Sequence, residues 1–294
     1  MDSPDPDVLR IVDEVRRACL AHDGQDPLDE AAHLLLKHRG ADALDGAWVR
    51  DSGFALLHDG ALDLAVAPAA RRRGVGGALL ERAVAGTPGG LTAWSHGDHP
   101  AAAALAERTG FERVRELWVM RRSVAVPLPA AEPPAGVTIR SYAGPADDAP
   151  LLEVNAAAFA HHPEQGALDE AGLAERMAEP WFDPGGLLLA IDGTGELLGF
   201  HWTKRHDDEH GEVYVVGIAP AAQGRGMGRV LTVAGLAHLA AAGVSEVLLY
   251  VESDNAAAVR LYSGLGFTHA RADTHAQYRR SQLVGLPVQE ASDR

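Results

Sequence analysis

The sequence predicts two consecutive domains of the α/β (α+β) class, each a mixed, mainly antiparallel sheet flanked by helices. The chain has 294 residues, which is too many for one ordinary domain and comfortable for two. It also repeats itself: residues 67–76 (APAARRRGVG) and 219–228 (APAAQGRGMG) are identical at seven of ten positions, at a spacing of 152. Strands outnumber those of a doubly wound parallel sheet and helices follow only some of them, which favours a mixed sheet.

A second pair of matching blocks follows the first, in the same order and at a spacing of 156. The matched residues are Asp98, Ala101, Ala102, Leu105, Gly110 and Phe111 in one half and Asp254, Ala257, Ala258, Leu261, Gly266 and Phe267 in the other. Ordered Gly, Asp and Phe matches are hard to attribute to chance, so we interpret the halves as homologous domains. A Pro/Ala-rich stretch near 123–136 suits neither a helix interior nor a central strand. It predicts domains at 1–125 and 137–294, joined by a linker at 126–136.

Apolar and β-branched runs predict the strands, and helical spacing predicts the helices. In the first half we expect strands at 47–49, 54–57 and 62–67 and helices at 76–85 and 99–109. In the second half we expect strands at 137–140, 187–191, 197–205, 212–218, 247–251 and 269–278, with helices at 148–159, 168–179, 225–242 and 255–265.

The composition limits the function classes. The formal net charge of −15 argues against general binding of nucleic acid or of an anionic membrane. The first ten residues carry acids where a secretory signal carries basic residues, and no apolar run could span a bilayer, so we expect a cytoplasmic protein. A single cysteine, Cys19, excludes an internal disulfide framework and a cysteine-based zinc site, and we expect it to be packed. Because the whole protein is acidic, any anionic ligand must be held by a local binding feature.

Each repeat contains such a feature, a glycine-rich turn between a strand and a helix. Backbone N–H groups at a helix start lack intrahelical partners, and glycines let several of them converge on one anion. The turn at 223–229 adds two arginines, and the turn at 71–76 adds three. One such turn alone could equally be ligand-free; its occurrence twice at matched positions favours a pyrophosphate cradle. His206 and His210 have helical metal-ligand spacing, but a polar hairpin loop between two strands is the better interpretation, and we expect no metal.

The turn, followed by N-x-x-A-x-x-x-Y at 255–262 and by Gly266-Phe267, resembles the GCN5-related N-acetyltransferases (GNAT). The resemblance covers both halves and implies two tandem GNAT domains that use acetyl-CoA. It implies a pantetheine-binding strand before each turn, phosphate contacts in the turn, and further contacts at the next helix. In the second half the implied cofactor residues are Val216, Gly217, Ile218, Gln223, Gly224, Arg225, Gly226, Met227, Gly228, Arg229, Asn255, Ala256, Ala257, Ala258, Val259 and Arg260. In the first half they are Leu64, Ala65, Val66, Arg71, Arg72, Arg73, Gly74, Val75 and Gly76.

Segments outside the shared motif, at 159–166, 181–184, 197–204, 211–218 and 249–255, are similar to a tandem-domain actinobacterial branch of this family. That branch acetylates the cysteinyl amine of a cysteine–glucosamine–inositol conjugate. The resemblance implies a polyhydroxylated, cationic small-molecule acceptor, and we expect a monomer. The implied acceptor residues are Glu30, Glu164, Lys204, Glu212 and Glu252. Two alternatives stay open: a tandem acetyltransferase for another amine such as an aminoglycoside, and a CoA-binding sensor without catalysis.

Amide formation from a thioester needs a base for the amine and a proton for the departing thiolate. The resemblance makes Glu212 the general base and Tyr262 the general acid. Strand alternation predicts that Glu212 shares a face with Tyr214 and Val216. Taken singly, Glu212 could be a solvated strand-end carboxylate and Tyr262 a half-buried helix residue. The first half lacks both, with Gly60 and Ala106 at the matching positions, so it should bind cofactor or support the fold without chemistry.

Overall fold

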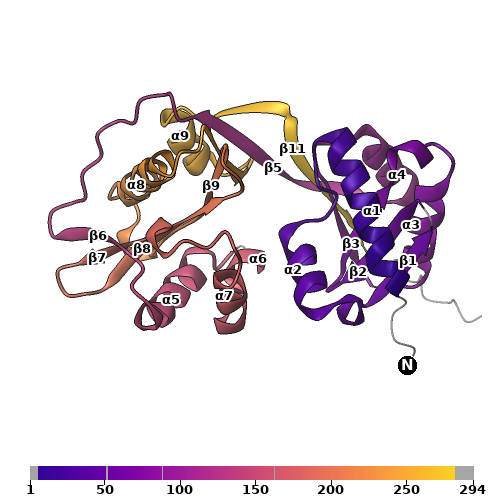
Figure 1. Ribbon diagram of the computed structural model, residues 1–294, viewed down its shortest axis with the longest axis horizontal. Coiled ribbons are helices and arrows are strands. Elements are labelled where there is room, and N and C mark those ends of the chain that lie inside the picture. The colour runs from indigo at the N-terminus through magenta and orange to yellow at the C-terminus, as the bar shows by residue number, and fades with distance from the viewer. Residues whose placement is uncertain (1–5, 51, 88, 162, 282–294) are drawn as a thin grey trace, which may run out of the picture. The chain divides into compact units, whose positions relative to one another are not determined.

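The computed structural model describes residues 6–50, 52–87, 89–161 and 163–281, without the side chains of residues 6, 7, 163 and 164 (Figure 1). It contains two compact units. Among the described residues, the first joins residues 6–117 with residues 271–281, and the second contains Trp118–Ala270. The units therefore divide the chain within two long strands, β5 (Glu112–Ser123) and β11 (Thr268–Arg280), and differ from the sequence-based division at 126–136.

The first unit is a mixed sheet with helices on both faces, and its strand order is β1-β2-β3-β4-β11-β5. Its elements are α1 (Pro6–Asp23), α2 (Glu30–Arg39), β1 (Gly46–Arg50), β2 (Gly53–His58), β3 (Ala61–Val66), α3 (Val75–Ala85), β4 (Leu91–Ser95) and α4 (Pro100–Thr109). Val12 and Val15 of α1 pack with Phe54 on one face, and Leu79 of α3 packs with Leu57 on the other. Strand β3 is parallel to β4, and β11 is antiparallel to β4.

The second unit has the strand order β11-β5-β10-β9-β8-β7-β6. Its elements are β6 (Val137–Ser141), α5 (Asp148–Ala158), α6 (Pro163–Gly166), α7 (Glu170–Met177), β7 (Leu187–Asp192), β8 (Leu197–Arg205), β9 (His210–Ile218), α8 (Met227–Ala241), β10 (Glu246–Glu252) and α9 (Ala256–Gly264). Leu151 of α5 and Leu173 of α7 pack on one face, whereas Leu236 of α8 and Tyr262 of α9 pack on the other. Strands β6 to β9 are antiparallel and β9 is parallel to β10. The predicted mixed sheet flanked by helices is confirmed.

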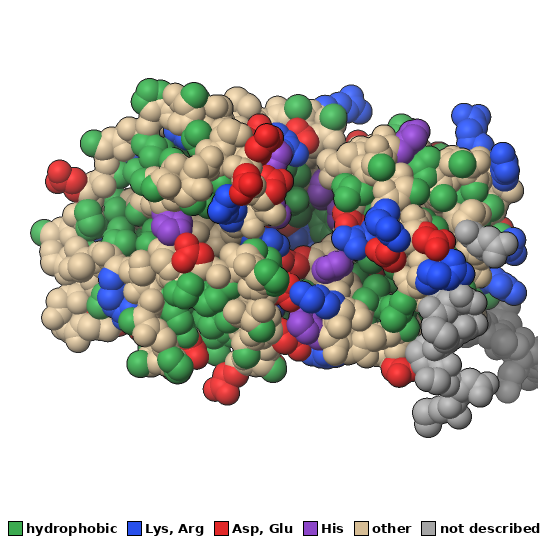
Figure 2. All heavy atoms as spheres, in the orientation of Figure 1, with side chains coloured by type: hydrophobic (Ala, Val, Ile, Leu, Met, Phe, Trp, Pro, Cys, Tyr) green, Lys and Arg blue, Asp and Glu red, His purple; other side chains and the backbone are tan. Residues whose placement is uncertain are grey.

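The predicted elements are found within a few residues of their expected bounds, and residues 124–136 contain neither helix nor strand. Among the described residues, five α-helices and strands have no counterpart among the elements expected above: α1, α2, α6, β4 and β5. No helix in the described part of the chain is long and apolar enough to cross a membrane. On the face in Figure 2, Lys and Arg side chains are spread out rather than gathered into one basic patch.

A β-bulge in β9 changes which side chains share a face. Trp202 of β8 lies opposite Val215 and Thr203 lies opposite Val213, so Tyr214 is an extra residue in β9. After the bulge Val215 packs with α5 and α7, as Tyr214 does, whereas Val216 packs with α8 and α9. The prediction that Val216 shares a face with Tyr214 and Glu212 is therefore wrong, because an inserted residue reverses the alternation.

A glycine in α8 leaves room for a buried histidine of β8. The His201 side chain is fully buried, and its Nδ1 donates to the carbonyl of Leu231 at 2.9 Å. Burial lowers the pKa of His201 to about 4, so the ring is neutral near pH 7. A Cβ atom at Gly235 would lie 2.1 Å from two atoms of this ring.

We therefore expect Gly235→Ala to lower the free energy of unfolding by about 1–3 kcal/mol, since a packed core does not absorb an added methyl group. Chemical denaturation measures the change. Gly264→Ala is the control, because Gly264 lies in a different helix, α9, and a Cβ atom built on it would meet nothing within 4 Å. An unchanged stability of Gly235→Ala would contradict the packing described above.

Candidate functional site

The second unit presents a strand–turn–helix built around two glycines. Strand β9 ends at Ile218, a short 3₁₀ turn covers Pro220–Ala222, and α8 begins at Met227. Gly224 and Gly226 have φ angles of 74° and 79°, in the left-handed region that favours glycine. Gly226 is the N-cap of α8 and carries no capping side chain. The first backbone N–H groups of α8 can therefore serve an external anion.

The side chains around this turn divide into exposed and buried ones. Gln223 and Arg225 are exposed, and Arg229 is half-buried in the first turn of α8. Met227 is 1% exposed and packs in the core, so only its backbone is available to a ligand. Asn255, expected near the cofactor, caps α9: its side chain accepts from the N–H of Ala258 at 3.1 Å.

Helix α9 carries Tyr262 and packs beside the first turn of α8 through Leu261. Leu261 of α9 is the nearest side chain to Gly228, and a Cβ built there would lie 3.6 Å from it. Tyr262 is 9% exposed and contacts Phe267 edge to face, with the ring centroids 5.9 Å apart. Burial raises the pKa of Tyr262 to about 12. Its hydroxyl therefore keeps its proton at neutral pH and can act as a proton donor.

Glu212 is a buried carboxylate near the start of β9, with 5% of the residue exposed. The imidazole Nε2 of His206 lies 2.7 Å from its Oε2. The loop interpretation of residues 206–210 is compatible with the structure, but it did not identify this inward-facing imidazole. The register of the β8–β9 hairpin explains the contact: Arg205 pairs with Gly211, which places residue 206 opposite residue 210 and diagonal to residue 212.

Lys204 lies opposite Glu212 in the neighbouring strand β8. Its Nζ is 4.8 Å from the centroid of the Trp181 ring and 5.1 Å from that of Tyr214, in cation–π geometry. The hydroxyl of Tyr214 accepts from Nε of Arg176 at 3.0 Å. This aromatic floor beneath Lys204 was not identified from the sequence.

The other expected acceptor residues belong to separate elements. Glu252 ends β10, and Glu30 begins α2 in the first unit. Glu164 lies in α6, and its side chain is outside the described residues. Among the described residues, no group of three His, Cys, Asp or Glu side chains is placed to hold a metal ion, and His210 pairs with Asp207.

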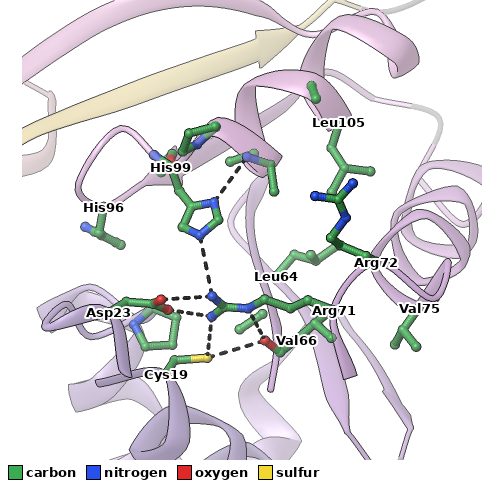
Figure 3. Close-up of a pocket in the computed structure, with 18 of the residues that line it drawn as sticks. Cys19, Asp23, Leu64, Val66, Arg71, Arg72, Val75, His96, His99 and Leu105 are labelled. Atoms are coloured by element: carbon green, nitrogen blue, oxygen red, sulfur yellow. Dashed lines mark hydrogen bonds and ion pairs between the residues drawn. The ribbon is translucent and has the colours of Figure 1, made fainter. Parts of the chain in front are cut away.

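The first unit repeats the strand–turn–helix and opens into a pocket of about 870 Å³ (Figure 3). Arg72 and Gly74 have φ angles of 61° and 82°, and α3 begins at Val75. The predicted residues of this half line the pocket, except Arg73, which is exposed. The position that matches Tyr262 is Ala106, in the core beside α3. The position that matches Glu212 is Gly60, in the turn between β2 and β3.

Arg71, expected to contact phosphate, is held by the protein itself. Its guanidinium donates to both carboxylate oxygens of Asp23 in α1, one at 2.8 Å, and to the carbonyl of Val66 at 3.0 Å (Figure 3). Cys19 lies 3.4 Å from the same guanidinium and is 2% exposed, so the expectation of a packed thiol fits. The Asp23 partner was not identified from the sequence. Arg72 and Arg73 are exposed, so a ligand can reach their side chains.

The Asp23–Arg71 pair predicts an acid-dependent contribution to stability. The guanidinium of Arg71 lowers the pKa of Asp23 from 3.8 to about 2. A depressed folded-state pKa contributes stability above pH 3.8 that is lost as the pH falls through about 2, here about 2 kcal/mol. We expect the unfolding free energy of Asp23→Asn to fall less steeply between pH 4 and 2 than that of the unmodified protein, measured by urea titration at each pH. Parallel curves would contradict the pairing.

Comparison with known proteins agrees with this architecture. Residues 155–267 match the model of the acetyltransferase (GNAT) family, and residues 33–113 match an acetyltransferase (GNAT) domain model. Two solved structures share the fold over nearly their full length. A tandem GNAT protein from the clavulanic acid biosynthesis pathway has a TM-score of 0.69 at 18% identity and covers 96% of this chain and 97% of its own. A GCN5-related N-acetyltransferase from Sphaerobacter thermophilus has a TM-score of 0.66 at 23% identity, covering 95% and 94%.

Sequence relatives are closer. The mycothiol acetyltransferase of Nocardioides sp. is 59% identical over 297 residues, covering 95% of this chain and 100% of the relative. The mycothiol acetyltransferase of Nocardia farcinica is 50% identical over 290 residues, covering 93% and 94%. With two GNAT units and such identity along the whole length, the chain belongs to the GNAT acetyltransferases and, within them, to the mycothiol acetyltransferase family.

Proposed function

We propose that this protein transfers the acetyl group of acetyl-CoA to the cysteinyl amine of cysteinyl-glucosaminyl-inositol, the last step in making mycothiol. The observation that carries the proposal is the 59% identity, along the whole chain, to a relative named mycothiol acetyltransferase. The second unit supports it with a buried carboxylate, a buried tyrosine and an uncapped helix start after β9.

In the proposed reaction the acceptor nitrogen attacks the thioester carbonyl directly. Glu212 takes a proton from the amine, the new C–N bond forms, and a backbone N–H of β9 stabilises the oxyanion. The C–S bond then breaks, and Tyr262 gives its proton to the departing thiolate. The products are the acetamide and CoA. The chemistry uses no metal.

We assign acetyl-CoA binding to the turn of each unit. In the second unit, residues 216–218 would contact the pantetheine arm, the turn at 223–229 the phosphates, and the start of α9 the rest of the cofactor. In the first unit Arg72 and Arg73 would contact the phosphates, because the guanidinium of Arg71 is paired with the carboxylate of Asp23. The absence of counterparts of Glu212 and Tyr262 favours a first unit that binds cofactor without transferring acetyl.

We assign the acceptor to Lys204, Glu212 and Glu252, with Glu164 and Glu30 as further contacts. Carboxylates accept from hydroxyl and ammonium groups, and Lys204 donates to sugar or inositol oxygens. We propose a cytoplasmic location, with which a single cysteine in 294 residues is compatible. We also propose that the protein is a monomer. We propose that the homologous repeats are residues 1–125 and 137–294, joined by 126–136.

The test is CoA release from acetyl-CoA with synthetic cysteinyl-glucosaminyl-inositol, with glucosaminyl-inositol and kanamycin as parallel acceptors. Turnover of the cysteinyl conjugate alone is the expected result. Faster turnover of kanamycin would identify an aminoglycoside acetyltransferase instead. Tight acetyl-CoA binding without turnover of any acceptor would favour a CoA-binding sensor.

A further inference from the structure

We infer that His206 is a positioning residue that orients the Glu212 carboxylate toward the acceptor amine. The inference deepens the proposed function and rests on it, because it assumes that Glu212 is the base. Its basis is the 2.7 Å contact between His206 Nε2 and Glu212 Oε2, which joins the loop after β8 to the buried carboxylate. His206 acts through Glu212 and not on the substrate.

The loop that carries His206 is built to hold it in place. The backbone N–H of His206 donates to the carbonyl of His210 at 2.9 Å, which closes the hairpin. The Asp207 side chain accepts from the N–H groups of Glu209 at 2.7 Å and His210 at 2.8 Å, and it also pairs with the His210 ring. The two histidines therefore have different partners: His210 is bound within the loop, and His206 reaches out of it to the strand.

The surroundings of Glu212 make this contact important. Leu248 of the parallel strand β10 and Lys204 of β8 lie opposite Glu212 in the sheet. The ammonium of Lys204 is stacked on Trp181 and Tyr214. The Glu212 side chain is 7% exposed, so water gives it little solvation, and a hydrogen-bond donor such as His206 offsets part of the cost of burying this side chain.

The contact also selects one oxygen of Glu212. Nε2–H of His206 donates to Oε2, which orients the carboxylate so that its other oxygen, Oε1, can take the proton of the amine. A base oriented by a third group in this way is a recurrent arrangement in acyl transfer. The His206 side chain is 35% exposed, so the ring fills the boundary between the buried base and solvent.

The test compares three variants of the full chain with acetyl-CoA and cysteinyl-glucosaminyl-inositol. We expect His206→Ala to lower kcat by about tenfold to a hundredfold, less than removal of the base itself, with KM for acetyl-CoA changed by about twofold or less. His206→Gln can donate an amide N–H from nearly the same position and should recover most of this loss. His210→Ala is the matched control from the same loop, and it should stay close to the unmodified rate. Added imidazole should raise the rate of His206→Ala and leave that of His210→Ala unchanged.

Three results would overturn the inference: an unchanged kcat in His206→Ala, an equal loss in His210→Ala, or no recovery in His206→Gln. Glu212→Gln in the same assay separates this inference from the proposed function. If Glu212→Gln is inactive and His206→Ala is fully active, only the positioning role fails. If Glu212→Gln is fully active, the assigned base itself is wrong.

Discussion

Glu212→Gln is expected to lower kcat by about 10²- to 10⁴-fold while acetyl-CoA still binds, because the amide cannot take a proton from the acceptor amine. The substitution keeps the shape of the side chain, and the amide oxygen can still accept from His206, so the local packing should persist. Steady-state rates with the cysteinyl acceptor measure kcat, and calorimetric titration measures acetyl-CoA affinity. The combination of a large loss in rate and an unchanged affinity is what a base requires.

Glu209→Gln is the matched control for that experiment. Glu209 is exposed in the loop that carries His206. The Glu209→Gln substitution therefore removes one negative charge from the same hairpin without changing Glu212. A loss in Glu209→Gln comparable to that in Glu212→Gln would attribute the effect to net charge near the site. A Glu212→Gln rate within about tenfold of the unmodified protein would rule out a general base at this position.

Tyr262→Phe is expected to lower kcat by about 10²-fold, because the thiolate must then leave without a positioned proton donor. Phenylalanine has nearly the same volume and can keep the edge-to-face contact with Phe267, so the fold should not change. The pKa of Tyr262, raised to about 12, keeps the hydroxyl protonated across the working range of pH. The loss should therefore not depend on pH between about 6 and 9.

The leaving group gives a sharper readout of the same role. When an acetyl thioester of a more acidic aryl thiol replaces acetyl-CoA, the aryl thiolate can depart without being protonated. The ratio of the unmodified rate to the Tyr262→Phe rate should therefore be smaller with this acetyl donor than with acetyl-CoA. Tyr250→Phe is the control, since Tyr250 is 44% exposed in the neighbouring strand β10. An equal loss with both donors would show that Tyr262 does not supply the proton.

Local features of the sequence were enough to predict most elements and both glycine turns. Each turn can be predicted from a local sequence pattern: a strand is followed by glycines, which adopt positive φ, and then by a helix. Features that depend on distant parts of the chain were missed. Asp23 meets Arg71 only after α1 folds onto the sheet, and no spacing rule relates residues 48 positions apart.

The site was predicted less completely for the same reason. Strict alternation along β9 placed Val216 with Glu212, but the bulge at Tyr214 depends on pairing with β8 and cannot be read from β9 alone. His206 was assigned correctly to a loop, yet its contact with Glu212 follows from the register of the β8–β9 hairpin. Residue types were readable from the sequence, whereas side-chain partnerships needed the sheet.

The position of β11 determines what happens when the chain is divided into two fragments. Residues 271–280 of β11 belong to the first unit, where Ala276 pairs with Ser95 and Tyr278 pairs with Ala93 of β4. A gene divided between its two repeats would therefore deprive the upstream fragment of a strand encoded at the far end. In that fragment the edge of β4 that pairs with β11 would have unpaired backbone N–H and C=O groups, which favour aggregation through strand pairing with other chains. The boundaries of the sequence repeats therefore differ from those of the compact units, because the first unit contains a strand segment from the C-terminal part of the chain.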